Sequence, residues 1–541
     1  MNIVRASGIP NRLLQTNVYD RSGSNASSYF LAQNVKTTNV KPFVSLSYKK
    51  NLSRSTTAEG SNPIWNETLD LEVVESPVDL KDDIRIEIFD EYVENLINED
   101  YSRSMEVYQR IYANWLGEYR LPISTLLKHK MIHGVFEINI PKLLVGYTIH
   151  NDHVEIPIEN SLDTSASCLL WFTISISPTI EIPETNVFCL DCTESEDLRK
   201  HIKNGHQKRF VDPLICTEEG KRICITRLLE SVPLPIDVAE NLVTISKRFV
   251  SLISLVKPTF NPMSGFDGIW LNNRRILEGN ICSPKDLGIL LSCYFINIGV
   301  NCWVVLGNGY PQYEVAYILY KSQANSIDFS LIDPCTGKTY STNDVICPLL
   351  QIKAVFNQSN FYSNIQRETR IAFTNFDFKD SSCWMSLFSR RGYAPTGGFQ
   401  EEDYIYRDPL KAAEIQKNIE RKIMKKINSW RSMRKTVWNR GFHSSMFNIL
   451  RNLEADTTYD LPPENYLERI QGDFPGYKIF GFTLNFPYSN LSAISDRIRS
   501  TGIHLNMHKE VEFATAVYIH SFQIISCRCG FSSYQLFLIE A

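Results

Sequence analysis

Apolar residues recur at alternate positions in several short segments of the first third of the chain. These segments are FVSLSY from Phe43, TLDLEV from Thr68, IRIEIF from Ile84, GVFEINI from Gly134 and LWFTISIS from Leu170. A period of two is typical of strands with one buried face, and no long helical pattern lies between these segments. We therefore predict an antiparallel β-sandwich over residues 1–180.

The middle of the chain follows a mixed pattern. A helix-like run, LGILLSCYF, precedes the strand-like runs CWVVL, YEVAYILY and FSLIDP. The uncharged stretch 287–307 is about long enough to cross a bilayer, but Asn and Gly residues interrupt it, so we interpret it as two buried elements. We expect an α+β domain over residues 232–400, after a polar linker at 181–231.

A long amphipathic helix is predicted after residue 400. Asp408 can cap its start, Pro409 suits its first turn and Gly441 follows its end. Its apolar stripe consists of Ile415, Ile419, Ile423, Ile427 and Trp430. From Lys411 to Arg440 the chain holds ten Lys or Arg against two Glu, a net charge of +8. Such a basic face is most often solvated, and the alternative is contact with an anionic membrane or an acidic partner.

The end of the chain mixes aromatic strands with a helix. FPGYKIFGFTLNFPYSN and VEFATAVYIH predict strands, and a helix is expected from Ser489 to Arg499. We expect the region 401–541 to add a compact α/β piece that completes the middle domain or docks on it. The final CRCGFSSYQLFLIEA follows no pattern that predicts an element.

Composition limits the classes of function. At 541 residues the chain exceeds one ordinary core, and an apolar fraction of 43% can fill roughly two to four domains. The net charge of -4, from 60 acidic and 56 basic residues, argues against a surface that binds nucleic acid as a whole. The 13 Cys lack the spacing of a secreted disulfide scaffold and no signal pattern precedes them, which favours a reducing cytoplasm.

One group of candidate metal ligands lies in the predicted linker. Cys189 and Cys192 stand near His201 and His206, and zinc prefers such thiolates and imidazoles. The two pairs are closer along the chain than in a usual zinc finger. An exposed linker with coincidental Cys and His is therefore the alternative to a zinc site.

The first region resembles a C2 domain. The resemblance lies in GSNPIWNETLDLEV, residues 60–73, and in the strand end IRIEIFDE. It implies that Trp65 fills an edge of the sandwich. Many C2 domains bind calcium through Asp carboxylates in the loops at one end of the sandwich.

The calcium ligands of that family are only partly present. Lys41-Pro42-Phe43-Val44 stands where the family has Asp-Pro-Tyr-Val, and Tyr92 lies two residues after the retained Asp90. Only an unusual geometry would let Asp20, Glu91 and Asp100 substitute for the missing ligands. We therefore expect no calcium site, and we expect the sandwich to dock on protein, with lipid contact as the alternative.

The middle region resembles the core of transglutaminase-like, papain-related thiol enzymes. The resemblance lies in the order helix, turn and three strands of DLGILLSCYFINIGVNCWVVLGNG, YEVAYILY and FSLIDPCTGKTY. The family's nucleophilic Cys, its His and its Asp fall on Pro284, Val315 and Asp333, so only the Asp is retained. Asp333 then becomes a turn residue at a strand end.

A shift of two residues would bring Cys282 to the helix start. A thiolate there still needs an imidazole as its base, and no histidine occurs between His206 and His443. The resemblance therefore implies a peptidase-related fold without catalytic activity. A thiol peptidase that uses Cys282 with a histidine from another segment is the alternative.

The whole chain resembles the coiled-coil and C2 domain proteins of the ciliary transition zone, through the two domains and through NWLGEYRLPIS, NPMSGFDGIW, WNRGF and STGIH. This resemblance implies a cytoplasmic, cytoskeleton-associated scaffold at the cilium base, needed for cilium assembly and for gating membrane-protein entry. Its implied partners are other transition-zone proteins of the Meckel and Joubert complex, with no cofactor, metal, nucleic acid or small-molecule substrate.

Two other roles stay open. One is that of a centrosomal or basal-body protein of the related family that shares both domains, and the other is a calcium-independent lipid-binding module. The coiled-coil region of the family is missing from the sequence, so we expect a fragment and make no prediction about oligomeric state. The expected fold class is a multidomain α+β protein, with a C2-like sandwich, a transglutaminase-like domain and a C-terminal helix plus α/β extension.

Overall fold

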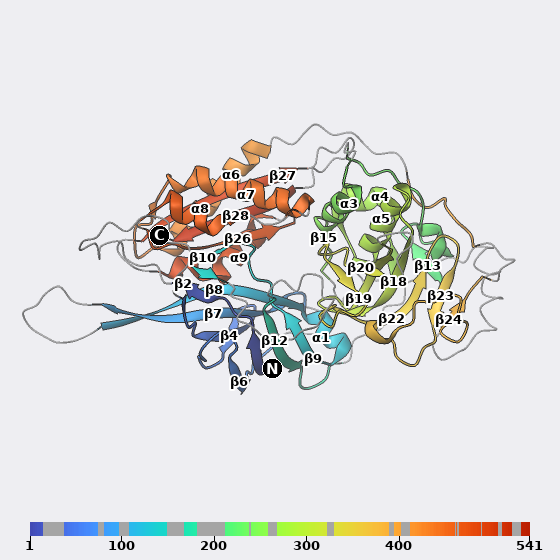
Figure 1. The fold of residues 1–541 in the computed structure, drawn as a ribbon, viewed down its shortest axis with the longest axis horizontal. Helices are drawn as coiled ribbons and strands as arrows, with labels where there is room; N and C mark the ends of the chain where they lie inside the picture. Colours follow the sequence, from blue (N-terminus) through green and yellow to red (C-terminus); the bar gives the residue numbers. More distant parts are fainter. Residues whose placement is uncertain are drawn as a thin grey trace, which may run out of the picture.

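The computed structural model shows three packed regions, with the N-terminal sandwich below, the C-terminal region above it and the middle domain beside both (Figure 1). The structure describes residues 1–13, 37–73, 80–96, 108–148, 167–180, 211–236, 240–257, 268–321, 329–388, 394–401, 412–459, 461, 465–475, 477–487, 490–506, 511–521 and 532–540. None of the helices in these ranges is long and apolar enough to cross a membrane.

Two four-stranded sheets, in the orders β6-β1-β12-β9 and β5-β4-β7-β8, form the N-terminal sandwich. Their strands are β1 (Asn2–Ser7), β4 (Pro42–Tyr48), β5 (Asn51–Arg54), β6 (Ile64–Thr68), β7 (Asp83–Leu96), β8 (Tyr108–Pro122), β9 (Met131–Glu137) and β12 (Leu169–Ser175). Helix α1 (Ile123–His129) joins the two sheets, and β2 (Asn11–Leu13), β3 (Thr37–Thr38) and β11 (Tyr147–Thr148) form a small third sheet. The alternating residues Ile86 and Phe172 lie in one core, which confirms the predicted sandwich.

One predicted strand is misplaced. The alternation of TLDLEV predicts a strand over residues 68–73, but β6 ends at Thr68 and residues 69–73 form no strand. The β1 pairing includes Asn2↔Thr68, and Leu69 exchanges hydrogen bonds with Met1 just beyond it, at 2.6 and 2.7 Å. Trp65 is 8% exposed and lies in the sandwich core, where the resemblance places it.

A seven-stranded antiparallel sheet, β21-β20-β19-β18-β22-β23-β24, forms the centre of the middle domain. Its strands are β18 (Cys302–Gly309), β19 (Glu314–Tyr320), β20 (Ser330–Ile332), β21 (Thr339–Ser341), β22 (Leu349–Phe356), β23 (Phe361–Asn364) and β24 (Trp384–Ser386). Around it lie β13 (Leu214–Thr217), β14 (Arg222–Cys224), β15 (Ser254–Leu255), β16 (Ile269–Trp270), β17 (Ile281–Cys282), α3 (Leu242–Ser251), α4 (Asn273–Gly279), α5 (Pro284–Asn297) and the short helices η3 (Ile225–Leu228) and η4 (Ile371–Phe373). Helix α5 and strand β18 confirm that the uncharged run 287–307 makes two buried elements.

The C-terminal region is a five-stranded sheet with helices on both faces. Its strands, in the order β10-β26-β28-β27-β25, are β10 (Leu144–Val145), β25 (Val437–Trp438), β26 (Phe480–Phe486), β27 (Glu512–Ser521) and β28 (Ser532–Glu540). Its helices are α6 (Ala412–Trp430), α7 (Phe442–Tyr459), α8 (Tyr466–Asp473), α9 (Leu491–Ser500) and η5 (Ile503–Leu505). On β27, Val517 shares a core with α6 and α9, whereas Ala516 shares a core with α7 and α8. Strand β10 comes from the predicted sandwich region, so the boundary at residue 180 does not separate the two sheets.

The basic helix is shorter than predicted. Asp408 and Pro409 lie outside the described residues, and α6 ends at Trp430 instead of just before Gly441. The chain turns inward because the buried guanidinium of Arg431 donates to the carbonyl oxygens of His504, at 3.0 Å, and Asn506. Val437 and Trp438 then pair with β27 as a strand.

The C-terminal region shares its main hydrophobic core with the sandwich. Ile427 and Phe482 lie in the same cluster as Trp115, whose ring is 5.0 Å from that of Phe482. Arg497 adds a contact of 2.7 Å to Glu118 of the sandwich, in which the carboxylate is 2% exposed. The C-terminal region therefore packs on the sandwich as well as on the middle domain, where it was expected to dock.

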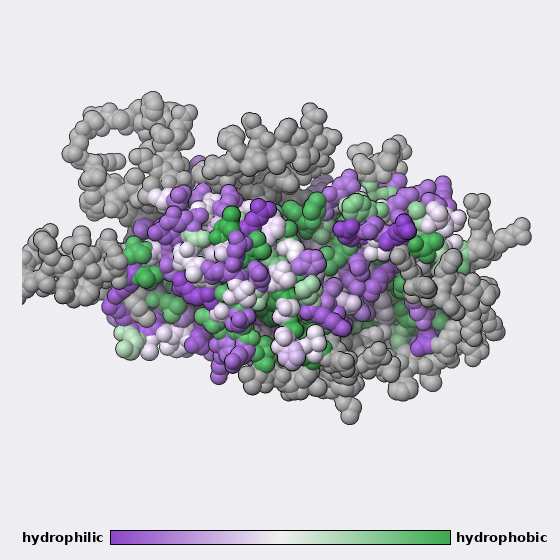
Figure 2. Space-filling view, turned by 90° about the horizontal axis from the view of Figure 1, so that it is seen from below, coloured by the Kyte–Doolittle hydropathy of each residue, from purple (hydrophilic) through white to green (hydrophobic). Residues whose placement is uncertain are grey.

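A second buried ion pair joins the C-terminal region to the middle domain. Arg248 on α3 donates to both carboxylate oxygens of Glu454 on α7, at 2.8 and 2.9 Å. On the face seen from below in Figure 2, hydrophobic residues are interspersed among hydrophilic ones.

Candidate functional site

The resemblance to thiol enzymes predicts the nucleophile position at the start of helix α5. Ser283 caps the helix, and Pro284 is its first residue. The Asp286 carboxylate accepts from the Ser283 hydroxyl at 2.8 Å and from the Ser283 backbone N–H at 3.1 Å. Its other oxygen accepts from the Leu271 N–H at 3.2 Å. The predicted position Pro284 thus lies in a complete capping box and offers no nucleophile.

Cys282 lies two residues before that position, in strand β17. It pairs with Leu255 of β15 and is completely buried. Burial raises the pKa of the Cys282 thiol well above its ordinary value, and the nearby Asp286 raises it further. Because the thiolate is the reactive form, this thiol is held in its unreactive, protonated state at neutral pH.

Val315 does not face Cys282 across the sheet. It lies in β19 and packs with Val305 on the face of the sheet that α5 leaves uncovered. The next residue, Ala316, faces α5 so closely that a Cβ on Gly288 would lie 2.6 Å from its own Cβ. Val315 and Ala316 thus point to opposite faces of the sheet, as neighbouring residues of a strand do, and the assignment of Val315 to the histidine position stays a prediction.

The charged group of β19 nearest the helix start is Glu314. Its carboxylate lies 3.0 Å from the ammonium of Lys285, the second residue of α5. Lys285, together with Lys128 and Lys353, lowers the pKa of Glu314 to about 2. Glu314 is thus a permanently ionised partner of lysines, which makes it unsuitable as a general base near neutral pH.

Asp333 follows β20 and is 7% exposed. Its carboxylate accepts from the Cys335 N–H at 2.9 Å and from the Thr336 hydroxyl at 2.8 Å, and its carbonyl accepts from the Gly337 N–H. Burial raises the pKa of this carboxyl group. Asp333 therefore holds a tight turn, which is the role that the Asp-Pro dipeptide predicts.

The Cys335 thiol follows Asp333, and burial raises its pKa well above the ordinary value, with Asp333 and Cys282 raising it further. The sequence contains no histidine between residues 206 and 443. His129 of the sandwich does reach this domain, with its ring 5.1 Å from Tyr310 and 4.7 Å from Tyr313. Both of these rings belong to the turn between β18 and β19.

The sequence did not predict the contact between His129 and Tyr310, because the two residues are far apart along the chain. Thr125 of the same helix donates to the Pro311 carbonyl at 2.7 Å, which fixes α1 against the hairpin. The desolvated imidazole has a lowered pKa, so it is neutral at neutral pH.

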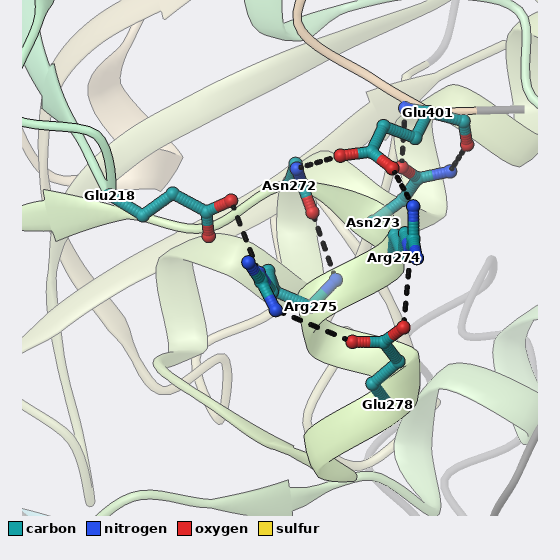
Figure 3. Close-up of polar contacts among 7 residues, drawn as sticks. All are labelled: Glu218, Asn272, Asn273, Arg274, Arg275, Glu278 and Glu401. Atoms are coloured by element: carbon teal, nitrogen blue, oxygen red, sulfur yellow. Dashed lines mark hydrogen bonds and ion pairs between the residues drawn. The ribbon is translucent and has the colours of Figure 1, made fainter.

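A polar network surrounds the neighbouring helix α4 and ties three segments together (Figure 3). Asn272 caps α4 by accepting from the Arg275 N–H and donates its amide to Glu401 at 3.1 Å. Arg274 contacts Glu401 at 2.6 Å and Glu278 at 3.0 Å. Each of these charged groups has a partner, so the network has a structural role in positioning α4 beside the start of α5.

At the loop end of the sandwich, an arginine side chain lies against a buried carboxylate. The buried carboxylate of Asp90 contacts the guanidinium of Arg12 at 2.6 and 2.7 Å. It also accepts from the Lys41 backbone N–H at 2.8 Å and from the Tyr147 hydroxyl at 2.7 Å. The guanidinium of Arg12 thus serves as the positive partner of the Asp90 carboxylate, and the ammonium of Lys41 lies 4.0 Å from Glu59.

Of the other candidate calcium ligands, only Glu91 lies among the described residues. Glu91 pairs with Arg54 at 2.8 Å, and Asp20 and Asp100 lie outside the described residues. Among the residues that the structure describes, no group of three or more His, Cys, Asp or Glu could hold a metal.

The zinc prediction is not tested, because all four of its candidate ligands lie outside the described residues: Cys189, Cys192, His201 and His206. Cys216 is disulfide-bonded, which differs from the all-thiol state expected in a reducing compartment. The other described cysteines, Cys282 and Cys335 among them, are free thiols.

These features define a protein in which a C2 sandwich is joined to a peptidase-like domain. The C2 domain family matches residues 2–138, and the CEP76 peptidase-like domain family matches residues 268–387. The chain is a homologue of coiled-coil and C2 domain-containing protein 2A and of protein CC2D2B.

The similarity to these two relatives extends over nearly the whole chain. The chain is 41% identical to the Drosophila melanogaster coiled-coil and C2 domain-containing protein 2A over 96% of its own length and 40% of the relative. It is 30% identical to human protein CC2D2B over 89% of its own length and 35% of the relative. A solved, calcium-bound structure of two C2 domains of extended-synaptotagmin 2 is 16% identical, covers 39% of this chain and 54% of that one, and has a TM-score of 0.14. The chain therefore spans well under half the length of the curated relatives.

Proposed function

We propose that the chain is a non-enzymatic scaffold at the base of the cilium, in the transition zone next to the basal body. There it supports cilium assembly and the gating of ciliary membrane proteins by contacts with other proteins of the Meckel and Joubert complex. The family resemblance suggests this place, and the homology to coiled-coil and C2 domain-containing protein 2A supports it. The scaffold would act from the cytoplasm.

One observation carries the non-enzymatic part of the proposal. Cys282 is a buried, protonated thiol, and the described part of its domain provides no imidazole to deprotonate it. Loss of the base in a triad of the transglutaminase or papain type lowers the rate by several orders of magnitude. We assign the peptidase-like domain to that group of folds on the order of α5, β18, β19 and β20. Its remaining use is as a rigid surface.

A centrosomal or basal-body role is the second candidate. The match to the CEP76 peptidase-like domain favours it, because that domain is shared with a different family. The two candidates differ in where the protein accumulates, so location in the cell separates them.

The test is expression of the tagged chain, and of its Cys282→Ser variant, in ciliated cells that lack the endogenous protein. We expect both proteins to accumulate just distal to the basal body and to restore the same fraction of ciliated cells. Accumulation at centrioles of cells without cilia would support the second candidate. Failure of Cys282→Ser at equal protein level would contradict the non-enzymatic role, and selective labelling of native Cys282 by a thiol-directed peptide probe would support that contradiction.

A further inference from the structure

Helix α6 uses its apolar face inside the protein. Ile423 is 1% exposed and Ile427 is completely buried, and both lie in the core shared with the sandwich. Ile415, Ile419 and Trp430 pack against the same core. The helix therefore cannot insert this face into a bilayer, as an interfacial amphipathic helix would. Only its outer face is available to a partner.

That outer face is a row of exposed cations. It consists of Lys417, Arg421, Lys422, Lys425 and Lys426, all of them exposed. None of the five side chains forms an ion pair with a described residue, and Glu420 of the same helix pairs with His443 instead. We call these five residues the basic row.

The cationic side chains of the basic row repel one another. Lys417 and Arg421, Arg421 and Lys425, and Lys422 and Lys426 are like-charged pairs four residues apart, and each such pair destabilises a helix by a few tenths of a kcal/mol. The helix persists because its apolar face is anchored in the core. The rest of the fold thus holds a concentrated positive charge, spread over about 13 Å of helix, at the surface.

We propose that the basic row is a membrane-contact surface that binds the headgroups of anionic lipids. Lysine ammonium groups on flexible stems suit a fluid layer of negative charges, whereas arginine forks suit fixed carboxylates in a protein. The centres of protein interfaces are depleted in lysine and enriched in aromatic anchors, and the row contains four lysines and no aromatic residue. This surface is independent of the scaffold role and of calcium, since Arg12 takes the place of a cation at the sandwich loops.

Flotation of the full chain with vesicles tests the proposal. The vesicles are made of phosphatidylcholine with phosphatidylserine, or of phosphatidylcholine alone. We expect binding only to the first kind, with or without a calcium chelator, and we expect it to weaken as salt rises. The variant K422Q/K425Q/K426Q should lower the partition coefficient on the order of 100-fold, because each lysine near an anionic surface contributes several-fold.

The matched control is K50Q/K81Q/K379Q, which removes three exposed lysines elsewhere and changes the net charge equally. It should bind as the wild type does. Glutamine keeps good helix propensity at exposed positions, so equal thermal melting curves will show that both variants are folded. Absence of wild-type binding, equal loss in both variants, or loss only in the control would overturn the proposal. Binding to poly-glutamate but not to vesicles would also overturn it, in favour of an acidic protein partner.

Discussion

The sandwich loop end and the peptidase-like site each contain a buried carboxylate, but the two are satisfied differently. Asp90 has the guanidinium of Arg12 as its counter-ion, at 2.6 Å. Asp333 accepts hydrogen bonds from the neutral Cys335 N–H and Thr336 hydroxyl, and burial raises its pKa. The first carboxylate is therefore neutralised by a side-chain cation, and the second is satisfied by neutral hydrogen-bond donors. The stability of the fold should therefore depend on the charge of Asp90, and it should not depend on the charge of Asp333.

Removal of the internal cation should have the largest effect. We expect Arg12→Ala to lower the free energy of unfolding by about 3 kcal/mol, because it leaves Asp90 charged and completely buried without its counter-ion. Urea-induced unfolding, followed by tryptophan fluorescence, measures the change.

Two further variants test the cause of that effect. Arg5→Ala is the control, because the Arg5 side chain is exposed and lies over the Trp171 ring, 4.3 Å from its centroid, so its loss should matter little. The double variant Arg12→Ala with Asp90→Asn should recover part of the stability, since it removes both charges. If the double variant were less stable than Arg12→Ala alone, the role of Arg12 as a counter-ion would be wrong.

Glu87 is a third buried carboxyl group, and it is less well satisfied than Asp90 or Asp333. It is 3% exposed on β7, one of its oxygens has no partner among the described residues, and burial and Glu118 raise its pKa to about 7. The folded protein therefore binds more protons than the unfolded chain above the ordinary pKa of 4.5. Stability should fall, by about 2 kcal/mol, as pH rises from about 5 to about 7.5.

Unfolding of wild type and Glu87→Gln over this pH range measures the effect. Glutamine cannot ionise, so the variant should lack this loss and be the more stable protein at the upper end of the range. Glu59→Gln, at a highly exposed carboxylate, should behave as the wild type. An unchanged pH profile in Glu87→Gln would show that Glu87 is not the titrating group.

Most helices and strands could be predicted where the apolar pattern of a single segment determines which of its faces is buried. Alternation identified β4, β7 and β12, and the apolar run after Pro284 identified α5 and β18. The strand β28 was missed because its sequence is apolar at consecutive positions and it pairs on both sides, with β26 and β27. A strand in the middle of a covered sheet has no alternation to detect.

The candidate sites were predictable only in part. Pro284 and the absence of histidine between residues 206 and 443 can be read directly from the sequence. The Arg12–Asp90 pair could not be predicted, because its two residues are 78 positions apart and meet only when the sandwich folds. The Arg248–Glu454 pair, with 206 positions between its residues, depends on how the middle and C-terminal regions dock, and no local pattern encodes that contact.

Substitution of Asp333, the buried carboxylate of the peptidase-like domain, should have the smallest effect. We expect Asp333→Asn to change the free energy of unfolding by less than about 1 kcal/mol, because the amide oxygen of Asn can accept the same bond from the Cys335 N–H. Asp90→Asn is the matched substitution, and it should destabilise more, since it leaves the Arg12 guanidinium without its charged partner. Both are measured by the same urea titration. Equal losses in the two variants would mean that Asp333 carries a charge on which the fold depends, and the peptidase-like site would then have to contain a cation that compensates it.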